Sequence, residues 1–213
     1  QTIFKGIGVS AHVIADAGCC GMPELGLSDF AGHEQRVQAL LSTLVQLKPA
    51  QILVACPRCL TGIRYLQKLY SFTPEETSLF PRIAGVFDFL ASQEWEPRRR
   101  ISRRFTVHDS CHQLRQASGK APLRSLLKRI LDHPISESES EVSCCGFGGS
   151  FVFRHPQQAA QLRRQRVEQL VAAKAEAVVT DCPFCAESLQ IPLRRQGLST
   201  ALLLDLLAES LHP

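Results

Sequence analysis

The sequence predicts an α/β fold made of two similar halves, each with a short parallel sheet flanked by helices. Short apolar segments rich in β-branched residues alternate with longer segments of helical periodicity, which is the order typical of parallel sheets covered by helices. A cysteine pattern also occurs twice, as a Cys-Cys-Gly turn followed by Cys-Pro-x-Cys. The separation is nearly the same in both copies, 36 positions from Cys20 to Cys56 and 37 from Cys145 to Cys182. Such a repeat indicates two copies of one structural unit.

The repeat divides the chain of 213 residues into two cysteine-rich halves, 1–94 and 105–213, joined by a linker over 95–104. In the second half, Cys111 precedes the Cys144-Cys145 pair by 33 positions. By the logic of the repeat, the matching cysteine of the first half would lie about a dozen residues before Gln1. We therefore expect the first half to be N-terminally incomplete.

The elements of the first half follow from local patterns. Apolar residues at helical spacing and an apolar, β-branched stretch predict a helix followed by a buried strand that delivers Cys56-Pro57 to the next helix. Turn residues and short apolar runs predict the remaining elements of this half. In chain order we expect a strand over His12–Ala15, a helix over Glu34–Lys48, a strand over Ala50–Ala55, a polar loop over Ser71–Ser78, and a strand running into a short helix over Ile83–Leu90.

The linker between the halves is predicted from charge. It contains Pro97 and five arginines, Arg98, Arg99, Arg100, Arg103 and Arg104. Short runs of like charge are usually solvated, so we favour a solvated linker. The alternative is a basic segment that docks an acidic partner or an anionic membrane surface.

The second half repeats the same order of elements. A strand over Phe105–Val107 leads to His108-Asp109-Ser110-Cys111-His112, so that the cysteine stands at the carboxyl end of the strand. Ligands at strand carboxyl ends are typical of an open α/β sheet with its site at the switch point. Further along we expect a helix over Leu123–Leu131, an exposed acidic loop over Ser136–Ser143, a helix over Gln157–Ala175, a strand over Val178–Asp181, and a closing segment, Leu198–Leu211, that echoes Val86–Ala91.

Composition excludes several classes of protein. Hydrophobic residues make up 45% and charged residues 21% of the chain, as in ordinary globular proteins, but nine cysteines are unusual. With no secretory signal and no apolar run that could cross a bilayer, a reducing compartment, the cytoplasm, is expected, where clustered cysteines are metal ligands rather than disulfides. A scattered net charge of +4 does not indicate nucleic-acid binding. No dinucleotide fingerprint or nucleophile elbow is present, so a flavin would belong to a partner.

The centre of the second half is a predicted metal site with five thiols. Successive side chains diverge in a regular strand or helix, so adjacent cysteines reach one pocket only from a curled backbone, which Gly146, Gly148 and Gly149 allow. Taken singly, a Cys-x-x-Cys motif is as readily a redox dithiol or half a zinc site, and a Cys-Cys pair is often two buried small residues. Five soft ligands are one more than tetrahedral zinc requires, which favours iron and sulfide. The five are Cys111, Cys144, Cys145, Cys182 and Cys185.

With these cysteines at this spacing, the sequence resembles the cysteine-rich CCG domain family, which includes heterodisulfide reductase (its B subunit) and the iron–sulfur subunits of glycolate oxidase and anaerobic glycerol-3-phosphate dehydrogenase. The resemblance implies two Rossmann-like α/β halves related by a pseudo-twofold axis. It also implies a non-cubane [4Fe-4S] cluster on the five cysteines of the second half. Cys19, Cys20, Cys56 and Cys59 would supply four of the five ligands of another cluster, or would hold zinc, as some relatives do in one half.

The resemblance further implies an oxidoreductase subunit, which takes electrons from a flavoprotein or ferredoxin-type partner and passes them to a disulfide or other small acceptor. The alternatives are a pure electron-transfer subunit of a flavin-linked dehydrogenase feeding quinone, with peripheral membrane association through a partner, or a zinc-stabilised scaffold module. His112 and Arg115 are candidates to donate hydrogen bonds to cluster sulfide or to an anionic substrate, against a capping or surface role. We expect His108 to be structural and Asp109 to cap the turn after its strand.

Overall fold

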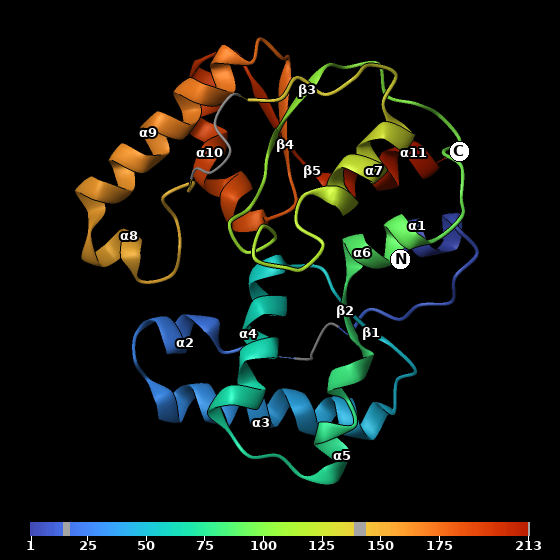
Figure 1. Cartoon of the computed structure of the whole chain (residues 1–213), viewed down its shortest axis with the longest axis vertical. Coiled ribbons are helices and arrows are strands. Elements are labelled where there is room, and N and C mark those ends of the chain that lie inside the picture. Colours follow the sequence, from blue (N-terminus) through green and yellow to red (C-terminus); the bar gives the residue numbers. More distant parts are fainter. Residues whose placement is uncertain (15–17, 139–143, 213) are drawn as a thin grey trace.

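The computed structural model describes residues 1–14, 18–138 and 144–212, and each half carries its own parallel sheet (Figure 1). In the first half, β1 (Ile52–Val54) pairs with β2 (Ile83–Gly85). In the second half the strand order is β3 (Phe105–His108), β4 (Ala177–Thr180) and β5 (Ser199–Leu202), all parallel. The predicted α/β class, with short parallel sheets flanked by helices, is confirmed.

The repeat seen in the cysteines extends to the helices and strands between them. Each Cys-Cys-Gly turn is followed by a short helix, a long helix, a strand, a helix that begins with proline, a second strand and a closing helix. These are α2 (Met22–Gly26), α3 (Phe30–Leu47), β1, α4 (Pro57–Leu69), β2 and α6 (Val86–Ser92) in the first half, and α8 (Phe151–Arg154), α9 (Pro156–Ala172), β4, α10 (Pro183–Arg195), β5 and α11 (Leu203–Leu211) in the second.

Five of the described elements stand outside this repeat. They are α1 (Thr2–Gly6), α5 (Pro74–Thr77), a 3₁₀ turn (Phe80–Arg82), β3 and α7 (Ala121–Ile130). Within the ranges that the structure describes, no helix combines the length and the apolar character needed to cross a membrane.

Local chemistry explains why these segments form as they do. All four residues of β4, an Ala-Val-Val-Thr run, are buried, as expected of a central parallel strand. Helices α4 and α10 each begin with proline directly after a cysteine in extended conformation, because the fixed φ of proline suits the first helical position. The cysteine at each of these helix starts is therefore held at the end of a strand.

Two of the predicted elements differ in the structure. Residues 12–14 form no strand, and Ala15 lies outside the described residues; Val13 is 64% exposed, so nothing buries this apolar segment. The predicted polar loop over Ser71–Ser78 contains α5, because Thr73 and Glu76 form a capping box around Pro74. Of the predicted acidic loop over Ser136–Ser143, residues 139–143 lie outside the described part, and Ser136 forms a bridge to Thr106 of β3.

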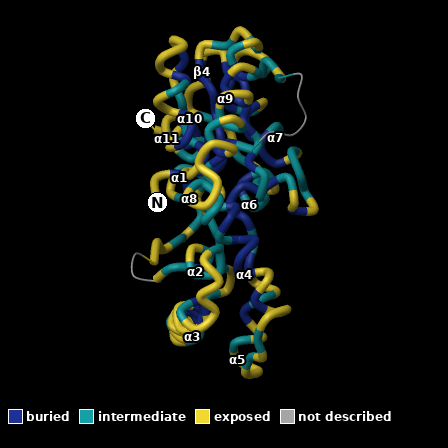
Figure 2. Tube along the Cα trace, turned by 90° about the vertical axis from the view of Figure 1, so that its left-hand side faces the viewer, coloured by how far each residue is buried: buried dark blue, intermediate teal, exposed yellow. Residues whose placement is uncertain are grey.

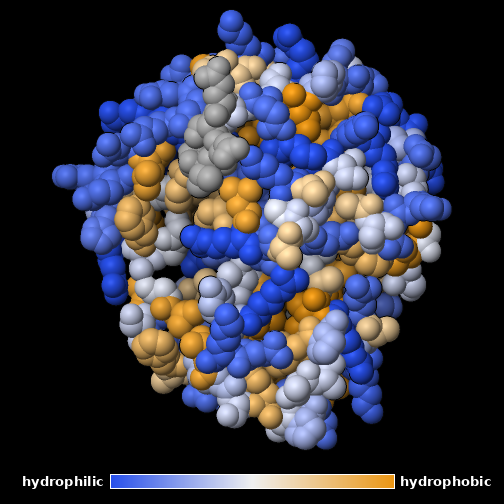
Figure 3. Space-filling view, in the orientation of Figure 1, coloured by the Kyte–Doolittle hydropathy of each residue, from blue (hydrophilic) through white to orange (hydrophobic). Residues whose placement is uncertain are grey.

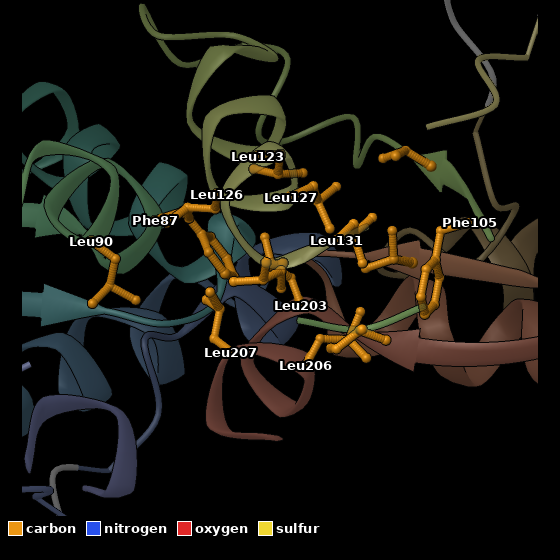
Figure 4. Packing of buried hydrophobic residues seen from close by; sticks show 14 of the residues in the cluster. Phe87, Leu90, Phe105, Leu123, Leu126, Leu127, Leu131, Leu203, Leu206 and Leu207 are labelled. Carbon is orange, nitrogen blue, oxygen red and sulfur yellow. The ribbon is translucent and has the colours of Figure 1, made fainter. Parts of the chain in front are cut away.

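The largest hydrophobic core lies between the second sheet and the helices α6, α7 and α11 (Figure 4). Phe87 and Leu90 of α6 pack there with Leu126 of α7 and Leu207 of α11, although α6 belongs to the first half in sequence. Helix α1 also joins this core through Ile3. The residues of α6 are accordingly mostly buried or half-buried, whereas many residues of α3 are exposed (Figure 2). The two halves are thus joined by shared apolar packing as well as by the chain.

The arginine-rich segment 95–104 is bound along the second half. The backbone N–H groups of Arg98 and Arg99 both donate to the carbonyl oxygen of Ser210. Arg100 pairs with Asp132 at 3.3 Å and Arg104 with Glu176 at 3.5 Å. Exposed pairs of this kind contribute about 1 kcal/mol or less each. Their effect is to fix the course of this segment.

We predict that Leu126→Ala destabilises the protein by about 3–5 kcal/mol, because Leu126 is fully buried in the shared core and its truncation leaves a cavity. Leu47→Ala, at a 54% exposed leucine on α3, is the matched control and should cost less than about 1 kcal/mol. Chemical denaturation of both variants checks this, and equal losses would contradict the assignment of the core.

Candidate metal centre

Eight of the nine cysteines form one row of neighbouring thiols that crosses from one half to the other. The sulfurs of Cys20 and Cys59 are 3.1 Å apart. Cys56 interacts with both Cys59 and Cys182, which is the link between the halves. In order the row is Cys20, Cys59, Cys56, Cys182, Cys185, Cys145, Cys144 and Cys111. Cys19 is half-buried, and no hydrogen bond joins it to another thiol within the described residues.

The ends of two neighbouring strands place Cys111 and Cys182 at the same edge of the second sheet. Asp181, which follows β4, accepts hydrogen bonds from the backbone N–H of Ser110 at 3.2 Å and from its hydroxyl at 2.8 Å. Both residues are buried. Burial raises the pKa of Asp181 to about 6, while the two donors of Ser110 favour its ionised form. This pair fixes the positions of the cysteines that come next in the chain.

The two Cys-Cys turns use the same backbone conformation. Gly21 and Gly146 both have a φ of 74°, in the left-handed region that favours glycine. A Cβ atom on Gly146 would lie 2.2 Å from the carbonyl oxygen of Ala159 on α9, and one on Gly21 would lie 2.5 Å from the ring of His33 on α3. Each turn therefore packs directly on the long helix of its half, which aims the adjacent cysteines at one pocket.

A polar clamp joins the halves beside the thiols. The amide nitrogen of Gln116, on the loop after β3, donates to the hydroxyl of Thr61 on α4 at 3.0 Å and to the carbonyl oxygen of His112 at 3.1 Å. Arg64 donates to the side-chain oxygen of the same glutamine. Because Gln116 is buried, these bonds keep α4, and with it Cys56, against the second half.

Without a metal, the thiols divide into thiolates and thiol donors. Hydrogen bonds from Cys182 and Cys59 lower the pKa of Cys56 to about 2, and those from Cys111 and Cys145 lower the pKa of Cys144 to about 2. Donation to Cys144 raises the pKa of Cys111 in turn. A metal ion needs its thiol ligands deprotonated, so binding here would release protons and neutralise the repulsion between neighbouring thiolates.

A buried histidine lies beside this row. Nδ1 of His108, at the end of β3, accepts a hydrogen bond from Nε of Arg166 at 2.9 Å. Burial, and then the neighbouring Arg166, lower the pKa of His108 to about 3, so the ring is neutral and its proton is on Nε2. This buried N–H has no partner among the described residues. One ring nitrogen of His108 lies within 4.8 Å of the sulfurs of Cys145 and Cys185.

The residues present fit a group with several sulfur-bound metals. The row supplies more thiol ligands than a single tetrahedral ion accepts, from two halves that meet at Cys56 and Cys182. The N–H of His108 is a donor without an acceptor, and metal-bound sulfur accepts such hydrogen bonds in iron–sulfur proteins. A buried donor left unpaired costs free energy, which a bound cluster would recover.

A cleft of 540 Å³ opens onto one end of the row. Cys111 and Cys144 line it and are half-buried, whereas Cys145, Cys182 and Cys185 are buried. His112 and Arg115 line it as well. Helices α2 and α8 also border the cleft, and the surface is hollowed where they face each other (Figure 3). A small molecule in this cleft would meet the thiol row at Cys111 and Cys144.

Several functional residues escape sequence reasoning. The contact of Cys56 with Cys182 depends on how the halves pack, which no local pattern reports. We expected His108 to have a structural role, and the structure shows in addition that it lies beside Cys145 and Cys185. Asp109, expected to cap a turn, instead binds Arg124 through both carboxylate oxygens at 2.8 Å. The position of His108 three residues before Cys111 is the one sequence signal that points to the site.

The comparisons with known proteins assign the family. A family model described as "Cysteine-rich domain", the CCG family, matches residues 2–64 and 105–190. The chain therefore belongs to the cysteine-rich CCG domain family. The matched segments contain all nine cysteines.

Three relatives show in which kinds of protein similar sequences occur. The chain is 29% identical over 126 residues to a fumarate reductase (CoM/CoB), in its B subunit, of Methanothermobacter marburgensis, covering 59% of this chain and 26% of that protein. It is 28% identical over 196 residues to an uncharacterised iron–sulfur protein of Methanocaldococcus jannaschii, covering 91% and 37%. It is 22% identical over 213 aligned positions to a lactate utilization protein A of Bacillus mycoides, covering 92% and 82%. The chain thus spans about a quarter to two fifths of the first two relatives. Together these findings support an iron–sulfur cluster and a redox role.

We predict that Gly146→Ala destabilises the protein by about 2–4 kcal/mol, because the new Cβ meets the backbone of α9 and the backbone is strained. Gly119→Ala is the control: Gly119 also has a positive φ, 52°, but a Cβ there would have no neighbour within 4 Å. It should lose only about 1 kcal/mol. Denaturation of the metal-free proteins measures both, and equal losses would show that the turn does not pack on α9 as described.

We also predict that His108→Phe lowers the midpoint potential of the metal-loaded protein. Loss of an N–H···S hydrogen bond worth about 1 kcal/mol corresponds to roughly 40 mV for one electron. Redox titration followed by EPR measures the shift. His33→Phe is the control, since His33 is equally buried but packs on the first Cys-Cys turn. A potential unchanged in His108→Phe would rule out the hydrogen bond.

Proposed function

We propose that this chain is the iron–sulfur subunit of an oxidoreductase complex, heterodisulfide-reductase-like, which passes electrons through a non-cubane [4Fe-4S] cluster to a disulfide or other small acceptor. The observation that carries the proposal is the cleft beside Cys111 and Cys144, because a site meant only to pass electrons between buried centres needs no opening for a small molecule. The relatives' names support the redox class. They refer to different reactions, so they do not name the acceptor.

In this proposal the five cysteines Cys111, Cys144, Cys145, Cys182 and Cys185 hold the cluster of the second half. In the first half, a second cluster or a zinc ion is held by Cys20, Cys56 and Cys59. Cys19 is next to Cys20 in the sequence. When bound, the cluster supplies single-electron transfer and an iron open to a substrate sulfur. Reducing a disulfide to two thiols takes two electrons and two protons, and the electrons would come from a flavoprotein or ferredoxin-type partner.

The remaining residues of the cleft would bind and orient the acceptor. Nδ1 of His112 is buried without a partner among the described residues, so it is free to hydrogen-bond a molecule in the cleft or a sulfur of the site. Arg115 is exposed at the same cleft. Cys145, Cys182 and Cys185 are buried, which keeps water from the inner part of the site.

The proposal predicts that Cys111→Ala lowers both the second-site iron content and the rate of disulfide reduction by at least about tenfold. Loss of a residue that only supports a metal ligand already lowers metal affinity or activity about tenfold or more, and loss of the ligand itself should cost no less. Cys19→Ala is the comparison, because Cys19 belongs to the first half and lies outside the thiol row; it should keep the second-site iron. The anaerobic, reduced protein is mixed with a small disulfide, and released thiol is measured beside the iron content and the EPR spectrum.

Each outcome decides between the candidates. A cluster whose EPR signal responds to thiol, with disulfide reduced, supports the proposal. A cluster that reduces a quinone analogue but no disulfide would make the chain a pure electron-transfer subunit. Colourless protein that contains only zinc would make it a zinc-stabilised scaffold module.

A further inference from the structure

The cleft beside the thiol row carries three positively charged side chains. Three arginines and two histidines line it from three elements, and no aspartate or glutamate is among the described residues that form its wall. Arg58 comes from the start of α4, His112 and Arg115 from the loop after β3, and Arg154 and His155 from the end of α8. Sequence reasoning singled out only His112 and Arg115. Arg58 reaches the cleft because the halves pack together, and Arg154 and His155 reach it from α8 within the second half.

These arginines have no carboxylate partners in the described part of the chain. Arg58, Arg115 and Arg154 take part in none of its ion pairs. Arg58 is only 8% exposed, and its guanidinium makes one hydrogen bond, at 3.3 Å to the carbonyl oxygen of Met22, and lies 5.4 Å from the ring of Phe184. A buried guanidinium without a carboxylate partner favours an anion beside it.

Two other arginines, the half-buried Arg124 and the buried Arg166, show how guanidinium groups are satisfied elsewhere in the chain. Arg124 binds both carboxylate oxygens of Asp109. Arg166 uses all three of its guanidinium nitrogens in hydrogen bonds, to His108, Val107 and Ser138 among others. Arg58 departs from this pattern, and it does so at the wall of a cleft.

The backbone leaves room at Arg58. A Cβ atom on Gly149, whose φ is 56°, would lie 3.1 Å from a terminal nitrogen of Arg58. A side chain at this position would therefore crowd the guanidinium, and glycine leaves its face toward the cleft open. With 540 Å³, the cleft has the size of a small-molecule site.

Thiolates or a cluster could account for part of this charge. Arg58 follows Cys56 by two residues, and Arg115 follows Cys111 by four. Neutralising the thiol row does not explain Arg154 and His155, however, because α8 carries no cysteine. Positive groups on both sides of the cleft suit a molecule with negative charge placed between them.

We propose that this cleft binds a small organic anion that bears at least one carboxylate, with Arg58 receiving the carboxylate and Arg115 and Arg154 flanking it. A guanidinium matches a carboxylate with two parallel hydrogen bonds, which a neutral molecule does not offer. Only one part of the inference rests on the proposed function, namely that the bound anion is the class of molecule that accepts the electrons. The binding itself needs no electron transfer.

The test measures equilibrium binding of two probes of similar length to the metal-loaded full chain by calorimetry. The probes are suberate, a dicarboxylate that cannot be reduced, and octanediol, its neutral counterpart. Suberate should bind at least about tenfold more tightly, which is 1.4 kcal/mol or more, and its affinity should fall as salt is added. Equal affinities, or no binding of suberate, would overturn the inference.

Variants locate the site. Arg154→Gln removes an exposed charge on α8 and should weaken suberate binding at least about threefold, without a cost in folding. Arg58→Lys keeps the charge but loses the paired hydrogen bonds, so it should weaken binding further. Arg164→Gln, an exposed arginine of α9 that does not line the cleft, is the control and should leave binding unchanged. An equal effect of Arg154→Gln and Arg164→Gln would mean general charge attraction and no site.

Two disulfides separate this inference from the proposed function. Dithiodipropionate has the shape and charge of suberate, and bis(hydroxyethyl) disulfide is neutral. If suberate binds but neither disulfide is reduced, the anion site stands and the proposed function fails. If the neutral disulfide is reduced as well as the charged one and suberate does not bind, the function stands and the anion site fails.

Discussion

The contact between Cys56 and Cys182 is the constraint on which the rest of the structure depends. It joins the thiols of the two halves into one row, so the halves cannot separate without dividing the site. Without a metal, hydrogen bonds from neighbouring thiols lower the pKa of Cys56 and of Cys144, so the row holds negative charge that a metal would neutralise. The shared core around α6 and the Gln116 clamp supply the packing and hydrogen bonds that hold the halves in contact.

The repeat gives both halves the same frame but not the same surroundings for their cysteines. Gly21 and Gly146 adopt the same φ and pack on equivalent helices. In the second half, β3 adds Cys111 and the His108–Arg166 pair, which have no counterpart among the described residues of the first half. Of the cysteines in the given sequence, the five of the second half include the two that line the cleft, Cys111 and Cys144.

Much of this architecture is predictable from sequence, because it depends on local patterns. The helix at α3, the strand at β4 and the proline-started helices follow from periodicity, apolar content and the fixed φ of proline. The strand expected at residues 12–14 does not form, because an apolar run becomes a strand only where another strand and a core receive it. The capping box that starts α5 is a local pattern too, and Thr73 and Glu76 could have predicted it.

The parts of the site that sequence does not predict come from packing between segments far apart in the chain. The cysteines themselves could be chosen from their spacing. The contact of Cys56 with Cys182, the approach of His108 to Cys145 and the meeting of Arg58 with Arg154 at one cleft depend on how two sheets and their helices are placed. Nothing within a few residues of any of these side chains reports its distant neighbour.

The central claim is that the thiol row holds an iron–sulfur cluster, and metal analysis tests it most directly. Iron, zinc and acid-labile sulfide would be measured per chain in anaerobically purified protein. The account predicts about four iron and about four sulfide for the second half, with a further cluster or one zinc in the first. Zinc alone, without iron or sulfide, would contradict it.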